Sequence, residues 1–116
     1  VLLSVVVGRC SHWYAPGLLL LGDAAHPMSP IRAQGINMAL RDIIVAANYL
    51  VPLLREAAEH TALDAALPKI QAEREPEIIR VQKLQAQEAA QAELLDKSAL
   101  IRWAASQLAP VLRYPV

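Results

Sequence analysis

The stretch LLLLGDAAHPMSPIRAQGINMALRD, residues 18–42, decides how this chain folds. It opens with consecutive leucines, which are typical of a short strand that helices bury on both faces. A loop with two prolines follows, from Gly22 to Gln34, and shows no hydrophobic periodicity. After Gly35, apolar residues recur every three or four positions as far as Leu50, which predicts an amphipathic helix. Strand, loop and helix in this order indicate an α/β fold.

The sequence on either side supplies further elements. The β-branched run Val5 to Val7 predicts a strand before the leucines. Pro52 is expected to kink or end the helix that follows Gly35. A second helix is predicted from Thr61, where Asp64 completes a capping-box-like pattern.

Two more prolines divide the rest of the chain. Pro68 should break or bend the second helix, and Pro76 suits the first turn of a third. A last helical stretch is predicted over residues 98–112. The third helix has only a thin apolar stripe, which indicates a solvated surface helix. A partner-binding coiled coil is the alternative, although no heptad is sustained.

Composition excludes several classes of protein. The 116 residues suffice for one domain or part of one, and 11 basic residues balance 11 acidic ones. This charge balance argues against nucleic acid and against polybasic membrane anchoring. The lone Cys10 excludes a disulfide framework, and the uninterrupted apolar runs are too short to span a membrane. We expect a soluble, cytoplasmic protein. The start at Val1, without Met or a signal peptide, suggests a fragment.

The quoted stretch also holds the residues suited to chemistry. Gly22 ends the leucine strand and permits close approach to the backbone. Asp23 offers a carboxylate that can accept hydrogen bonds from paired hydroxyls. Gly35, Ile36 and Asn37 open a helix, whose free N–H groups favour negative charge. A ligand with hydroxyls at one point and an electron-rich pole farther on would suit both features.

The segment GDAAHPMSPIRAQGINMALRD, residues 22–42, resembles the second flavin-binding motif of the FAD-dependent aromatic hydroxylases, the p-hydroxybenzoate hydroxylase-like monooxygenases. The resemblance implies a partial FAD-binding domain with short strands and a motif loop, followed by a mainly helical C-terminal portion. We place the FAD-binding part at residues 1–57 and the helical extension at residues 58–116.

The resemblance also implies roles for single residues. The aspartate at the position of Asp23 binds the ribityl chain of FAD in that family. The amides of Gly35, Ile36 and Asn37 lie against the pyrimidine end of the flavin, and Pro30 matches a proline at its edge. The implied cofactor-binding residues are Gly22, Asp23, Pro30, Ala33, Gly35, Ile36 and Asn37. No catalytic residue and no metal ligand set is assigned.

Two positions depart from the family pattern. Arg32 and Ala33 stand where small residues and glycine are common. Arg32 either brings a cation near the flavin or points to solvent. If the loop requires a positive φ at Ala33, the alanine costs about 1 kcal/mol.

Other polar and aromatic residues receive structural interpretations. His26 is expected to make a structural hydrogen bond, since Asp23 and His26 alone are a weak metal pair. Cys10 is expected to be a small buried residue. Trp13 and Tyr14 are expected to serve packing. The remaining histidines, His12 and His60, are expected at the surface.

The sequence contains no GxGxxG fingerprint for the ADP half of a dinucleotide. By resemblance, the intact enzyme uses FAD, NAD(P)H and O2 to hydroxylate an aromatic or other small organic substrate. The N-terminal part of the same polypeptide would be a partner, and a second copy of the chain, in a homodimer, is the other partner that we consider. The alternatives are a non-catalytic remnant whose helices form an interaction module, and a flavin reductase, dehydrogenase or halogenase.

Overall fold

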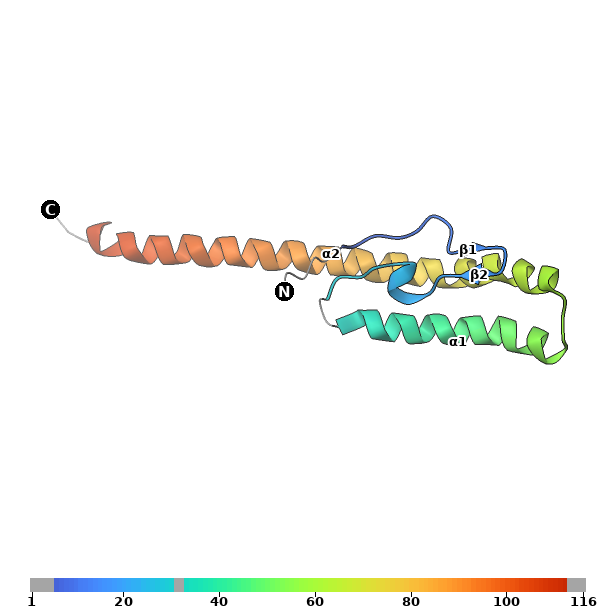
Figure 1. The fold of residues 1–116 in the computed structure, drawn as a ribbon. Coiled ribbons are helices and arrows are strands. Elements are labelled where there is room, and N and C mark those ends of the chain that lie inside the picture. The colour runs from blue at the N-terminus through green and yellow to red at the C-terminus, as the bar shows by residue number, and fades with distance from the viewer. Residues whose placement is uncertain (1–5, 31–32, 113–116) are drawn as a thin grey trace, which may run out of the picture. The chain divides into compact units, whose positions relative to one another are not determined.

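The computed structural model describes residues 6–30 and 33–112. Figure 1 shows the elements along the chain, and the contacts between residues divide the chain into two units, residues 1–83 and residues 84–116. The candidate site lies entirely in the first unit. The predicted division after residue 57 stays a prediction.

The sheet in the described part of the chain is a short two-stranded hairpin. Strand β1 (Tyr14–Ala15) pairs antiparallel with β2 (Leu18–Leu19), and Tyr14 lies opposite Leu19. Gly17 turns the chain with a φ of 72°, which glycine adopts without strain. The predicted leucine strand is therefore real but shorter than expected. Its burial on both faces is wrong for the described unit, because Leu18 is 54% exposed.

The predicted strand at residues 5–7 is wrong where it can be judged. Val6 and Val7 lie outside any strand and are exposed, and Val5 falls outside the described residues. The segment of residues 8–13 instead lies along helix α2 (His60–Leu112), whose side chains form hydrogen bonds with its backbone. Gln82 Nε2 donates to the backbone oxygen of Gly8 at 2.7 Å.

The motif loop contains one short 3-10 turn, η1 (Gly22–Ala24), before helix α1 (Gln34–Arg55). Pro52 does not end α1, which continues to Arg55. The helix closes with Ala57 in the left-handed region, at φ 51°, where glycine is the usual residue.

The prediction of three helices after Thr61 is wrong. Helix α2 runs unbroken through Pro68 and Pro76 and begins at His60. Both prolines are exposed, while Ile70 and Ile78 on the inner face are fully buried. Packing of that inner face therefore outweighs the hydrogen bond lost at each proline.

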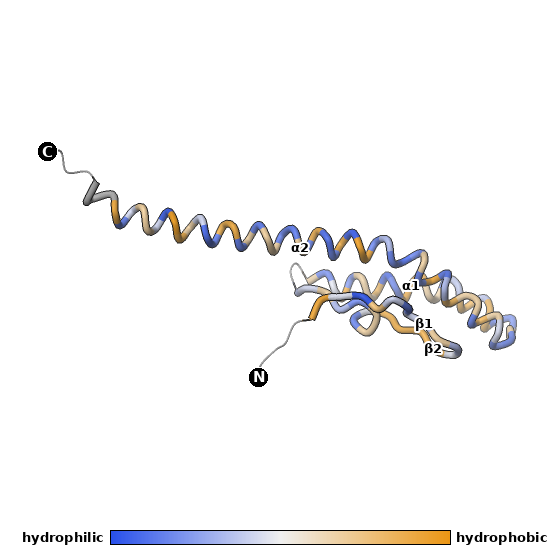
Figure 2. The backbone as a smooth tube through the Cα atoms, turned by 90° about the horizontal axis from the view of Figure 1, so that it is seen from above, coloured by the Kyte–Doolittle hydropathy of each residue, from blue (hydrophilic) through white to orange (hydrophobic). Residues whose placement is uncertain are grey.

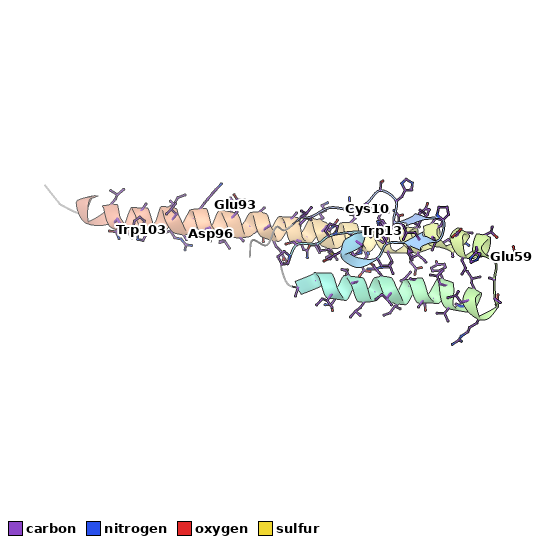
Figure 3. The ribbon with its side chains drawn as sticks, in the orientation of Figure 1. Cys10, Trp13, Glu59, Glu93, Asp96 and Trp103 are labelled. Carbon is purple, nitrogen blue, oxygen red and sulfur yellow. The ribbon has the colours of Figure 1, made fainter. Side chains whose placement is uncertain are left out.

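Polar residues of α2 hold the N-terminal segment in place. Gln71 Oε1 accepts from the backbone N–H of Trp13 at 2.9 Å, and its Nε2 donates to Ser11 O at 3.0 Å. Trp13 is fully buried between this segment and α2, as predicted for a packing residue (Figure 3). Cys10 is only half-buried, so its predicted burial is partly right.

Two apolar clusters fill the first unit. One surrounds the motif loop and the other lies farther along α1. The first comprises Trp13, Ala25, Met28, Met38 and Ile78, and the second comprises Ala46, Leu67 and Ile70. The loop is thus framed by buried contacts to both helices.

Apolar residues recur along α1 (Figure 2), and the described unit leaves one apolar face of this helix uncovered. The predicted periodic positions Ile36, Leu40, Ile43 and Ile44 are 73%, 53%, 54% and 59% exposed. By length and composition alone, α1 could cross a membrane, with 17% of its most apolar window buried. A helix that packs inside a larger domain meets the same criterion.

The second unit is the later part of α2. From residue 89 to residue 108 every side chain is exposed, including Trp103 at 61%. The prediction of a solvated helix is wrong for the polar Gln82, which is buried in the first unit, whereas Ile78 of the predicted apolar stripe is buried as that stripe implies. For residues 89–108 the solvated helix agrees with the structure, and the coiled-coil alternative stays a prediction.

Candidate functional site

The motif loop and the start of α1 line an open hollow of about 320 Å³ on the surface of the first unit. Most of the residues singled out in the sequence line it, together with Met28, Ser29 and Ala39. The predicted members are Asp23, Pro30, Ala33, Gly35 and Ile36. The turn η1, the motif loop and the start of α1 therefore all contribute residues to the lining of this hollow.

Asp23 lies in η1 at the mouth of this hollow, and its side chain is exposed. A methyl group on Gly35 would lie 3.8 Å from Asp23 Oδ1, so the carboxylate and the start of α1 are neighbours. Among the residues that the structure describes, no side chain caps α1 at its N-terminus. The N–H groups of Gly35 and Ile36 in its first turn can therefore meet a ligand.

Ala33 occupies the N-cap position of α1 with φ 49° and ψ 39°. This left-handed conformation confirms the condition under which alanine costs about 1 kcal/mol relative to glycine. The strained residue lies in the wall of the hollow. Arg32 falls outside the described residues.

The two remaining predicted residues lie beside the hollow. Gly22 is buried behind it with φ 61°, and a Cβ there would lie 3.2 Å from Ala39 Cβ. Only glycine therefore suits both its conformation and its packing. Asn37 lines an adjacent hollow of about 530 Å³, together with Arg41 and Glu77.

His26 is fully buried, and its Nε2 lies 2.5 Å from Asp42 Oδ2. Its ring also stacks at a tilt on Trp13, with centroids 5.2 Å apart. The prediction of a structural hydrogen bond is confirmed. His12 and His60 are exposed, as expected.

Asp42 is the centre of the polar contacts behind the loop. Its Oδ2 also accepts the Gly22 N–H at 2.9 Å, and its Oδ1 accepts Arg74 Nε at 2.7 Å. Burial by itself would raise the pKa of Asp42. Hydrogen bonds from His26, Arg74 and Gly22 outweigh burial and hold that pKa below its ordinary value of 3.8.

Sequence reasoning missed Asp42 and Arg74. Arg74 is only 3% exposed, because tertiary packing buries it. It also forms an ion pair with Glu77. One local feature could have indicated a buried role for Asp42, because this carboxylate lies within the apolar run of α1. Nothing local marks Arg74, which lies 32 residues away.

Another hollow, of about 280 Å³, lies at the far end of α1. Leucines dominate its lining, and none of the predicted cofactor-binding residues contributes. Its members include Leu50, Leu54, Leu63 and Leu67. The hollow beside Asp23 therefore remains the candidate site.

Comparisons with known proteins agree on one family. The model of the FAD binding domain matches residues 4–83. The chain is 42% identical over 85 residues to 6-methylpretetramide 4-monooxygenase of Streptomyces rimosus, covering 72% of this chain and 19% of that enzyme. It is 47% identical over 58 residues to ubiquinone hydroxylase UbiL of Rhodospirillum rubrum, covering 50% and 12%.

A solved structure shows the same relationship. PqsL of Pseudomonas aeruginosa, in complex with 2-aminobenzoylacetate, superposes with a TM-score of 0.61 at 33% identity. The match covers 70% of this chain and 21% of PqsL. The chain thus spans about a fifth or less of the relatives it matches. Since the family model covers the motif loop and both helices of the first unit, this chain belongs to the FAD-binding domain family of flavin-dependent monooxygenases.

Proposed function

We propose that the hollow beside Asp23 holds the ribityl and isoalloxazine portion of FAD in a monooxygenase. The full polypeptide that contains residues 1–116 would hydroxylate an aromatic or other small organic substrate with NAD(P)H and O2. The observation that carries this proposal is the meeting of an exposed carboxylate and an uncapped helix N-terminus at one hollow.

The residues present fit this part of the cofactor. The Asp23 carboxylate accepts hydrogen bonds from hydroxyl groups, as a ribityl chain offers. The N–H groups of Gly35 and Ile36, in the first turn of α1, favour the electron-rich end of the ring, because a helix N-terminus carries partial positive charge. Bound FAD would supply the electron transfer and the activation of oxygen, while the protein orients it.

The test is removal of the carboxylate. Asp23→Ala in the full polypeptide should weaken FAD binding by about tenfold to a hundredfold, since hydrogen bonds to a charged group contribute about 1.5–3 kcal/mol. The dissociation constant is measured by titration of flavin fluorescence. Glu59→Ala removes an exposed carboxylate outside the hollow and is the matched control. Equal affinity in wild type and Asp23→Ala would refute the assignment.

We also propose that the rest of the FAD-binding domain covers the exposed apolar face of α1, so that α1 is not a membrane span. The face gathers Ile36, Leu40, Ile43 and Ile44 on one side of the helix, each more than half exposed. Contiguous exposed apolar side chains of this kind mark an interaction surface. On the opposite side, the buried charge of Asp42 already has its partners within the first unit.

A labelling experiment tests this cover. A cysteine at Ile43 should react at least about tenfold more slowly with a thiol reagent than one at the exposed Lys69, because covered sites react only after local opening. The full polypeptide is labelled in buffer without detergent, and peptides are quantified by mass spectrometry. Equal rates at both positions would show that the face is free.

A further inference from the structure

Asp42 is fully buried and does not line the candidate site, yet the motif loop and α2 both supply donors to it. The donors are the Gly22 N–H of the motif turn, the His26 ring that follows it, and Arg74 of α2. Burying a carboxylate is costly unless its oxygens are paired. The cost of burying this carboxylate therefore points to a role for Asp42 in fixing the groups that it binds.

The turn η1, which contains Asp23, is held by hydrogen bonds at both the N–H and the carbonyl of Gly22. Asp42 holds the Gly22 N–H, while the Gly22 carbonyl accepts the N–H groups of Ala25 at 3.0 Å and His26 at 2.9 Å. With its φ of 61° and Ala39 against its Cα, Gly22 has little freedom to move. The direction in which Asp23 leaves this turn is thereby set.

We propose that Asp42 is a positioning residue for the flavin site, which orients Asp23 through Gly22 and His26. Arg74 holds the Asp42 carboxylate in the orientation that both contacts need. Flavin binding is therefore coupled to a residue of α2 that never touches the hollow. This inference rests on the proposed role of Asp23.

Asp42→Asn tests the inference with little change of shape. Its amide nitrogen is a donor, so the side chain cannot accept from Gly22, His26 and Arg74 together. We expect FAD binding at least about tenfold weaker, measured as for Asp23→Ala. Asp64→Asn is the matched control, because Asp64 Oδ1 also accepts a backbone N–H, that of Gly17 at 2.9 Å, away from the hollow. Its FAD affinity should stay within about twofold of wild type.

A double-mutant cycle separates positioning from mere stability. In the Asp23→Ala background, Asp42→Asn should weaken FAD binding by less than about twofold, because the group that it positions is gone. An equal factor in both backgrounds would show a structural role only and overturn the inference. Unchanged affinity in Asp42→Asn, with affinity lost in Asp23→Ala, would overturn it while leaving the proposed site intact. Unchanged affinity in Asp23→Ala would refute the site itself.

A second variant covers the case in which Asp42→Asn does not fold. His26→Asn keeps the pairing of Asp42 with Arg74 and removes only the imidazole arm. We expect FAD binding about threefold to tenfold weaker, again only when Asp23 is present. Near-UV circular dichroism establishes that the variant is folded. Wild-type affinity in folded His26→Asn would contradict the relay through His26.

Discussion

Replacing Trp13 with alanine should lower the free energy of unfolding by about 3–5 kcal/mol. The indole is fully buried against Met28, Met38 and Ile78, so its removal leaves a cavity between the N-terminal segment and α2. It also removes the ring that packs on His26. The loss is measured by urea denaturation of the full polypeptide, followed by far-UV circular dichroism.

Two variants show that the effect comes from burial. Trp103→Ala makes the same chemical change at a side chain that is 61% exposed, so it should cost less than about 0.5 kcal/mol (Figure 3). Trp13→Phe keeps an aromatic ring and removes Nε1, which is buried and has no hydrogen-bond partner among the described residues. It should therefore cost clearly less than Trp13→Ala. Equal losses at Trp13 and Trp103 would contradict the described packing.

Replacing Arg74 with methionine should lower the free energy of unfolding by about 3–5 kcal/mol at neutral pH. The change keeps a long apolar side chain but leaves the fully buried Asp42 carboxylate without its cationic partner. Urea denaturation of the full polypeptide measures the effect. Arg41→Met is the matched control: its side chain is 59% exposed in its pair with Glu77, so the loss should stay below about 1 kcal/mol.

The cost of Arg74→Met should depend on pH in a defined direction. The pKa of Asp42 is lower in the folded chain than its ordinary 3.8, so its ionised form stabilises the fold above that value. This contribution is lost as pH falls through the folded pKa. The difference between wild type and Arg74→Met should therefore shrink below about pH 4. A difference that stays constant from pH 7 to acid would exclude the unpaired carboxylate as its cause.

Local sequence signals located the elements near the motif but misjudged their extent. Glycine and proline marked the motif loop correctly, and apolar periodicity marked α1. The same rules failed at Pro68 and Pro76, where the chain remains helical. A proline disfavours a helix by a few kcal/mol, and the buried inner face of α2 offsets that cost. No local window of sequence contains the residues against which this face packs.

The sequence by itself indicated the family and the candidate cofactor, because residues 22–42 resemble the second flavin-binding motif of the FAD-dependent aromatic hydroxylases within one continuous stretch. It also identified Ala33 as the position where a left-handed backbone would meet a side chain. Only the tertiary structure decided which buried charges support that motif. Asp42 and Arg74 become partners because α1 and α2 pack together, and a contact across 32 residues depends on that packing rather than on any local pattern.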